Sequence, residues 1–284
     1  MKKFMKYEIK GTYKFMLGIL AVIVLASSMI QYNILKQMNM FDNPSSFGPN
    51  GFTVFIFILS VLVIFGAFIT AFFYIVNSFK KELYEDRGYL TFTLPLTGNQ
   101  ILGSKLLVAI MWNTVIGAVA FLYNLLLAMI LFKGEVREVL QQFFTVLDIS
   151  FITTVATSIV GAMLTLILVY FSISLSKVSI GNKKIGGMWF IIFLIISGVT
   201  GYITASVGEA IPYFLDINTF KIIPLEGVEQ IINNTFSGMG MSGFGDMAGA
   251  MPGFINLASF GMNILFAVLF FMGTGYLIEH RVEL

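Results

Sequence analysis

The chain has 284 residues, of which 57% are hydrophobic and 11% charged, and its mean hydropathy is +0.89. A soluble domain carries about 25% charged residues, so this composition lacks the polar surface that a water-soluble protein needs. The net charge of +2, the absence of cysteine and the single histidine, His280, argue against nucleic-acid binding, disulfides, thiol catalysis and a catalytic zinc or haem site.

Six apolar stretches follow one another along the chain, each long enough to cross a bilayer. A hydrocarbon core of about 30 Å needs about 20 apolar residues in a helix. The predicted spans are 15–35, 52–76, 106–132, 150–176, 185–207 and 254–278, and none contains Asp, Glu, Lys, Arg or His. We therefore predict an all-α integral membrane protein with one transmembrane domain over 1–284 and an outer loop at 208–253.

The basic residues gather in alternate connections. Residues 1–14, 77–105, 177–184 and 281 carry 13 of the 17 Lys and Arg. The positive-inside rule places these segments, and both termini, in the cytoplasm, as expected for a multi-pass protein of the plasma membrane. The alternative is a signal peptide cleaved near Ala26-Ser27-Ser28, which would leave five spans and put the basic loops outside.

The amino-terminal arm carries lysines at helical spacing: Lys2, Lys6, Lys10 and Lys14 recur every four residues. A cationic stripe beside an apolar one is typical of a helix that lies in the membrane interface. We expect such a helix to bend sharply into the first span. The alternative is a disordered arm that only sets the topology.

Amide side chains within or at the ends of the spans are few: Gln31, Asn33, Asn77, Asn113, Asn124, Asn256 and Asn263. Amides in lipid usually form hydrogen bonds across helices or line a wet cavity. Small residues at four-residue spacing also allow close helix contact, within one subunit or between two; they are Thr154, Ser158, Ala162, Ser197, Gly201 and Ala205.

The outer loop contains a Gly- and Met-rich stretch at 237–253, preceded by a more apolar segment. One interpretation is a pair of short half-inserted helices that shape an exit on the outer side. The other is a flexible loop.

The connection at 77–105 has the most informative pattern. Charged residues recur at helical spacing from Lys80 to Arg87, and Gly88 suits a helix stop. Thr97 and Gln100 match a capping box, so a second helix is predicted to begin near Gly98 and to continue into the third span.

The same connection resembles the permease subunits of type-2 ABC exporters. An acidic pair and Arg-Gly are followed by Thr-Leu-Pro and then by an apolar run with one lysine: Glu85, Asp86, Arg87, Gly88, Thr93, Leu94, Pro95, Ile101, Leu102, Lys105, Leu106 and Leu107. The resemblance implies an interfacial elbow helix at the amino terminus and a cytoplasmic coupling helix between spans two and three. The family's common Glu-Arg-Glu-x-Gly-Thr is here Tyr-Glu-Asp-Arg-Gly-Tyr.

By this resemblance, an ATPase partner would be contacted by four charged residues, Glu82, Glu85, Asp86 and Arg87, while Gly88 would let the chain turn. The alternative is a solvated charged turn that sets topology. The chain has no G-x-x-x-x-G-K-[ST] motif. ATP and magnesium would therefore be bound by separate cytoplasmic ATPase subunits, and the chain would carry no cofactor and would not itself be an enzyme.

The sequence thus predicts a permease that exports a hydrophobic or amphipathic substrate, such as a drug, a lipid or an antimicrobial peptide. It would pair with a second permease subunit, identical or related, in the lipid bilayer. Alternatives are an ion-coupled secondary transporter, which normally needs an ionisable group within a span, an intramembrane enzyme, and a non-transporting anchor or sensor subunit. His280, near the end of the chain, offers no constellation for such an enzyme.

Overall fold

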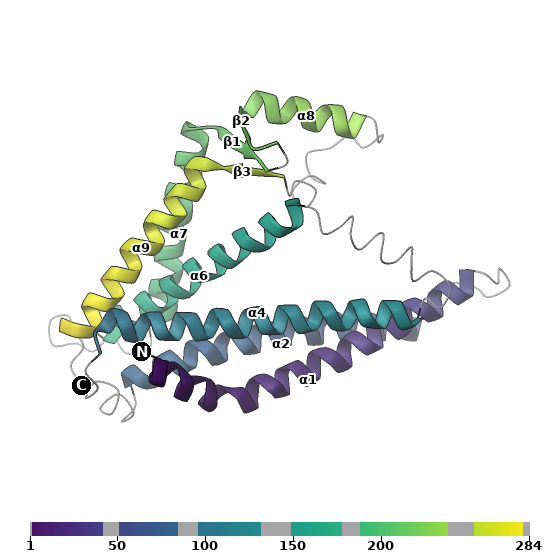
Figure 1. Ribbon diagram of the computed structural model, residues 1–284, viewed down its shortest axis with the longest axis horizontal. Coiled ribbons are helices and arrows are strands. Elements are labelled where there is room, and N and C mark those ends of the chain that lie inside the picture. The colour runs from purple at the N-terminus through teal and green to yellow at the C-terminus, as the bar shows by residue number, and fades with distance from the viewer. Residues whose placement is uncertain are drawn as a thin grey trace. The chain divides into compact units, whose positions relative to one another are not determined.

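The computed structural model describes residues 2–41, 51–84, 96–131, 149–177, 188–217, 219–237 and 253–280. Among them, six helices are long and apolar enough to cross a membrane (Figure 1): α1 (Lys2–Phe41), α2 (Gly51–Tyr84), α4 (Gly98–Leu131), α6 (Ile149–Lys177), α7 (Trp189–Ala210) and α9 (Leu257–His280). The predicted number and order of spans are confirmed. The chain is a multi-pass membrane protein.

The helices form two compact units. Unit 1 comprises Met1–Leu96 and Gly103–Gln142, and so contains α1, α2 and most of α4. Unit 2 comprises Thr97–Leu102 and Phe143–Leu284, which adds the first turn of α4 to α6, α7, α9 and a small sheet.

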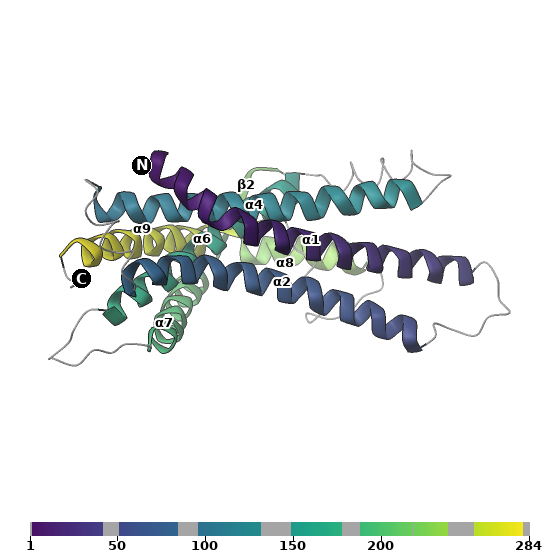
Figure 2. The same cartoon turned by 90° about the horizontal axis from the view of Figure 1, so that it is seen from below.

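In unit 1, α1 packs along α2, and both run beside α4 (Figure 2). The buried face of α2 carries small side chains, Thr53, Ser60, Ala67 and Ala71, at intervals of whole turns. Small residues let helix backbones approach closely in a membrane. The core beside them is apolar and includes Met16, Ile19, Leu20, Ile23, Val108, Trp112 and Ile116.

The amino-terminal arm is the first part of α1, which is one continuous helix of 40 residues. No proline interrupts it, and its internal glycines, Gly11 and Gly18, do not end the helix. The arm presents exposed lysines while Thr12 is buried. A separate elbow helix, set off from the first span, is therefore absent from the described part of the chain.

In unit 2, α6 packs against α7 and α9. Phe171 of α6 meets Phe270 of α9 edge to face, with ring centroids 4.9 Å apart. Asn256 caps the start of α9, because its Oδ1 accepts a hydrogen bond from the Ser259 amide at 2.9 Å. The same side chain donates to the Gly208 carbonyl at the end of α7, at 3.1 Å. Asn256 thus links two helices, as predicted for the amides.

The segment between α7 and α9 contributes to a three-stranded antiparallel sheet of unit 2, in the order β2-β1-β3 (Figure 1). Its strands are β1 (Tyr213–Asp216), β2 (Lys221–Pro224) and β3 (Phe254–Asn256). The amphipathic helix α8 (Leu225–Ser237) buries Val228 against Phe214, Ile223 and Phe254.

The predicted pair of half-inserted helices is wrong over the described part of the loop, where a hairpin precedes a single helix. The turn of that hairpin explains the difference. The Thr219 hydroxyl donates to an Asp216 carboxylate oxygen at 2.6 Å, and Phe220 adopts a positive φ of 53°. These features favour a tight turn over a helix. Most of the Gly- and Met-rich stretch, 238–252, lies outside the described residues.

Candidate functional site

One lysine of unit 1 lies between two carboxylates. Lys105, in the second turn of α4, places Nζ 2.8 Å from Glu8 Oε1 and 3.1 Å from Glu82 Oε2. Nζ also donates to the Ser78 hydroxyl at 3.1 Å and to the Ser78 carbonyl at 3.4 Å. The Ser78 hydroxyl in turn donates to Glu8. We call Glu8, Ser78, Glu82 and Lys105 the ion cluster.

The ion cluster is buried at its centre and more open at its edges. The Lys105 side chain is 2% exposed, whereas those of Glu8 and Glu82 are 15% and 13% exposed. A buried ammonium is costly unless it is paired and hydrogen-bonded, which explains why a lysine is tolerated in the apolar face of α4. Two carboxylates against one ammonium leave a formal excess of one negative charge.

The ion cluster joins three segments that are distant in sequence. Glu8 lies in the arm of α1, Glu82 in the last turn of α2, and Lys105 near the start of α4. The segment between α2 and α4 is therefore flanked by two helices that are joined by the ion pair between Glu82 and Lys105. Such a charge-assisted, multiply bonded contact fixes the relative positions of its partners more firmly than an exposed pair does.

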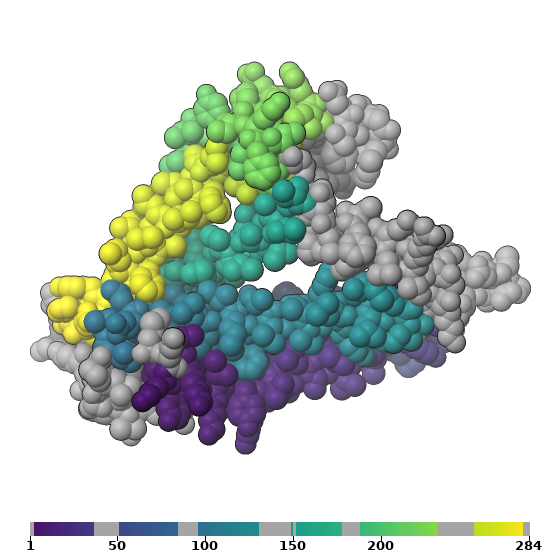
Figure 3. Space-filling view, in the orientation of Figure 1, coloured from purple at the N-terminus to yellow at the C-terminus, as the bar shows by residue number. Residues whose placement is uncertain are grey.

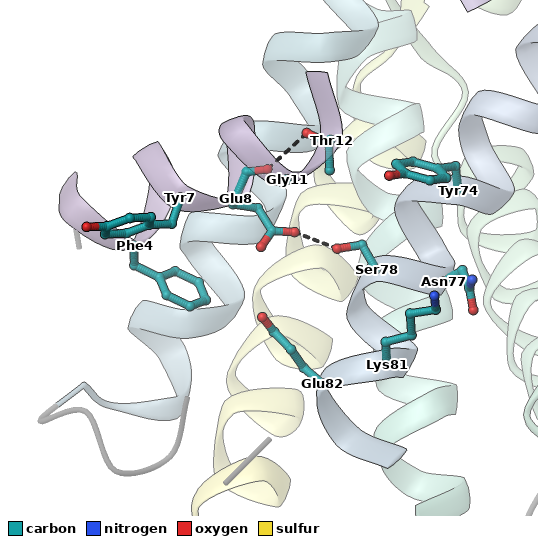
Figure 4. A pocket seen from close by; sticks show the side chains of 10 residues that line it. All are labelled: Phe4, Tyr7, Glu8, Gly11, Thr12, Tyr74, Asn77, Ser78, Lys81 and Glu82. Atoms are coloured by element: carbon teal, nitrogen blue, oxygen red, sulfur yellow. Dashed lines mark hydrogen bonds between the residues drawn. The ribbon is translucent and has the colours of Figure 1, made fainter. Parts of the chain in front are cut away.

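A cavity of about 450 Å³ opens beside the ion cluster, between the arm and the end of α2. Figure 4 shows Phe4, Tyr7 and Glu8 on the arm, with the carboxylates of Glu8 and Glu82 pointing toward each other. Tyr74, Asn77 and Lys81 line the cavity from α2, the helix that also carries Glu82. The lining combines aromatic rings, two carboxylates and one exposed ammonium, and it includes an amide predicted to bridge helices or line a cavity.

A second set of hydrogen bonds continues the link between α1 and α4. The Trp112 indole donates to the Thr12 hydroxyl at 2.9 Å, and Thr12 also lines the cavity. Farther along, the Ser28 and Tyr123 hydroxyls are 2.7 Å apart. Asn124 donates to Ser27 at 3.2 Å and accepts from Gln31 at 3.4 Å. The predicted role of Gln31 and Asn124 as bridges between helices is confirmed.

Of the predicted ATPase-contact residues, Glu82 lies in the ion cluster. Glu85, Asp86, Arg87 and Gly88 lie outside the described residues. The residues from Lys80 to Tyr84 continue α2 as its last turn and do not form a separate coupling helix.

The predicted capping box at the start of α4 is confirmed. The Thr97 amide donates to Gln100 Oε1, and the Gln100 amide donates to Thr97 Oγ1, both at 3.3 Å. Two free backbone donors at the helix start are thereby satisfied. The helix of the third span thus begins where the sequence predicts.

Sequence reasoning missed the roles of Glu8 and Lys105. Glu8 is the one acidic residue among five lysines in the first 14 positions, and Lys105 interrupts an apolar run. Each differs in charge from the residues around it, which indicates an ion-pair partner. The partner cannot be identified from the sequence, because Glu8 and Lys105 are 97 residues apart.

The described residues contain no group of three or more His, Cys, Asp or Glu side chains placed to hold a metal ion. No protein family model matches the sequence, and neither a curated protein nor a solved structure is significantly similar to the chain.

Proposed function

We propose that the chain is the membrane-spanning permease subunit of an ATP-driven exporter, in which a separate cytoplasmic ATPase drives a hydrophobic or amphipathic substrate outward. The observation that carries the proposal is the ion cluster. It ties together both helices that flank the segment 85–95 and the amino-terminal arm. A transporter that is driven by an ATPase in the cytoplasm needs a mechanical connection from the ATPase contact segment to the spans.

The geometry of the flanking helices suits force transfer. Glu82 is in the final turn of α2 and Lys105 in the second turn of α4, so a partner that moves the segment between them acts on both helix ends. The Glu8–Lys105 pair then carries the displacement to α1. In this proposal Glu85, Asp86 and Arg87 contact the ATPase, and Gly88 lets the chain turn. Glu82 contributes by pairing with Lys105, which fixes the end of α2 from which the segment begins.

The distribution of charge supports an energy source in the cytoplasm. In the described helices, ionisable side chains lie near the ends, and the central turns are apolar. The basic arm, both termini and the segment 85–95 face the cytoplasm in this proposal, as the charge bias indicates. The chain itself would bind neither ATP nor magnesium.

The proposed transporter pairs two permease subunits, identical or related. Exposed small residues on two helices would allow a close approach: Thr154 and Ser158 on α6, and Gly201 and Ala205 on α7. An added Cβ at Gly201 would meet nothing within 4 Å in this chain. In this proposal, Gly201 and Ala205 contact the second subunit.

The ion cluster also favours a second candidate function, an ion-coupled secondary transporter. Glu8 and Glu82 are largely buried carboxylates beside a cavity, and ionisable groups of this kind mark ion pathways in membrane proteins. Their place at the helix ends, away from the middle of the spans, makes this the weaker candidate.

Co-purification tests the proposal. We expect an ATPase subunit encoded by the same organism to co-purify with the wild-type chain and to hydrolyse ATP in the complex. Replacing Glu85, Asp86 and Arg87 together with Ala is expected to weaken the association or the hydrolysis. A matched control removes two acidic residues and one basic residue from the outer region: Lys221→Ala, Glu226→Ala and Glu229→Ala.

The outcomes separate the hypotheses. Unchanged association and hydrolysis in the first triple variant would contradict the assigned contact residues. Absence of any ATPase partner would contradict the permease function. Transport in proteoliposomes driven by a proton or sodium gradient without ATP would establish the ion-coupled alternative.

A further inference from the structure

The outward face of α1 changes from cationic to apolar along its length, and α1 lies at the surface of unit 1 (Figure 3). Four exposed lysines share this face at spacings of three and four residues: Lys3, Lys6, Lys10 and Lys14. The same spacing continues into exposed apolar residues: Leu17, Ala21 and Leu25. The opposite face of the helix is buried in unit 1. The cationic part of the outward face therefore ends at Lys14, and an apolar part begins one turn later.

Lys14 and Lys36 lie at the two ends of the apolar part of α1. Both are exposed, and none of the residues between them is Asp, Glu, Lys, Arg or His. They are 22 residues apart, which corresponds to about 33 Å along an α-helix. The hydrocarbon core of a bilayer is about 30 Å thick, so Lys14 lies at the level of the lipid headgroups. The exposed Tyr13 beside it fits this level, because tyrosine is enriched at membrane–water interfaces.

The other three lysines lie at increasing distances from this boundary. Lys10 is one turn beyond Lys14, about 6 Å along the helix, whereas Lys6 and Lys3 are about 12 Å and about 16 Å beyond it. Figure 1 shows the arm continuing from the apolar part of α1 at an angle, within one unbroken helix. The attraction of an anionic surface for a lysine falls off within a Debye length, about 8 Å at physiological salt. Lys10 and Lys14 are therefore the two lysines within its reach.

We propose that Lys10 and Lys14 bind the phosphate of an anionic phospholipid whose acyl chains lie along Leu17 and Leu25. Side chains four residues apart on a helix are neighbours, so both ammonium groups can pair with one phosphate. The apolar residues that continue the same face favour a lipid over an acidic protein surface, which would match only the charges. This inference goes beyond the proposed transport function, since it needs neither an ATPase nor a particular orientation in the membrane.

Two matched double variants test the proposal. Lys10→Gln with Lys14→Gln removes the two lysines near the boundary, and Lys3→Gln with Lys6→Gln removes the same charge from the distant end of the same face. The purified full-length protein in maltoside detergent is titrated with dioleoylphosphatidylglycerol, which is anionic, or with dioleoylphosphatidylcholine, which is zwitterionic. Mass spectrometry of the intact complexes gives the dissociation constant of the first bound lipid. Thermal unfolding verifies that both variants are folded, as expected for exposed positions.

We expect the parent protein to bind phosphatidylglycerol more tightly than phosphatidylcholine. The Lys10→Gln and Lys14→Gln pair should weaken phosphatidylglycerol binding about ten- to thirtyfold, the scale of two lysines at an anionic surface. The Lys3→Gln and Lys6→Gln pair should weaken it less than about threefold, because these lysines lie beyond the Debye length. Binding of phosphatidylcholine should be nearly the same in all three proteins. Added salt should weaken phosphatidylglycerol binding to the parent, since it screens the attraction.

Equal losses in the two double variants would overturn the proposal, because they would place all four lysines at one level, as in an arm that lies flat in the membrane interface. Unchanged phosphatidylglycerol affinity in the Lys10→Gln and Lys14→Gln pair would also overturn it. If this pair also lost a co-purifying protein partner, the face would belong to that partner and not to a lipid. If the pair failed to fold, the single variants Lys10→Gln and Lys14→Gln would decide, each with an expected loss of about fivefold.

Discussion

Trp112 donates a hydrogen bond to Thr12 at 2.9 Å across 100 residues of sequence. One turn before Thr12 is Glu8, and two turns before Trp112 is Lys105, so both cross-helix contacts lie on the same faces of α1 and α4. Farther along, Ser28 meets Tyr123. Residues later in α1 therefore contact residues later in α4. The two helices are therefore parallel, and a row of polar side chains fixes their register.

Thr12→Val tests this register. The substitution keeps the shape of the side chain but leaves the Trp112 N–H without its acceptor in a buried site. We expect the free energy of unfolding to fall by about 1–3 kcal/mol, the cost of an unsatisfied buried polar group. A denaturant titration in mixed micelles measures it. Thr70→Val is the control, since the exposed Thr70 hydroxyl donates to the Gly66 carbonyl of its own helix. Equal losses in both variants would contradict the assigned role of Thr12.

Lys105→Met should be more damaging. It leaves Glu8 and Glu82 close together, largely buried and without their shared cation. Breaking a buried ion pair on one side costs about 3–5 kcal/mol. Thermal unfolding in detergent is the measurement, with the exposed Lys36→Met on α1 as control. Adding Glu8→Gln to Lys105→Met should restore part of the loss, because it removes one of two like charges that lie close together. A further loss of stability on this addition would contradict the pairing.

Gly275→Ala tests the contact between the start of α4 and α9 in unit 2. A Cβ at position 275 would collide with the Asn99 side chain and would lie 3.2 Å from the Asn99 amide nitrogen. We expect a loss of about 1–3 kcal/mol in unfolding free energy, as for other overpacked sites. Gly261→Ala, on the same helix, faces open space and should be neutral or stabilising by up to about 1 kcal/mol. Asn99→Ala should relieve part of the loss in Gly275→Ala. No relief would show that Asn99 is not the obstacle.

The absence of cysteine allows a direct test of topology. Glu226→Cys on α8 and Glu279→Cys at the end of α9 each introduce one exposed thiol. Under the proposed orientation, a membrane-impermeant maleimide labels Glu226→Cys in intact cells and labels Glu279→Cys only after permeabilisation. The reverse pattern would invert the orientation and move the ion cluster to the outer face.

The sequence predicts best what depends on local pattern. The spans follow from apolar length, and the start of α4 follows from the reciprocal side chains of Thr97 and Gln100, which lie within one turn. The sheet between α7 and α9 was missed because β1 and β2 are four residues each, too short for a clear alternating pattern, and β3 pairs with β1 from 40 residues away. Its existence depends on contacts that composition does not specify.

The candidate site is harder to predict for a related reason. Glu82 was singled out as a contact for a partner protein, whereas its carboxylate lies against Lys105 of the same chain. A charge near a helix end looks the same in sequence whether it faces solvent or a buried partner. The amides of Gln31 and Asn124 were predictable in kind, since lipid offers them no hydrogen bonds, but their pairing with each other was not.

The ion cluster also constrains how this protein can evolve. Neutralising position 105 alone removes the ammonium group that pairs with the carboxylates at positions 8 and 82. Reversing the charge at position 8 alone places two ammonium groups next to each other. Viable lineages would have to pass through paired replacements, so positions 8, 82 and 105 should vary together in an alignment of relatives. Such correlated substitution, at separations of 23 to 97 residues, would identify relatives that share this arrangement even where the spans have diverged.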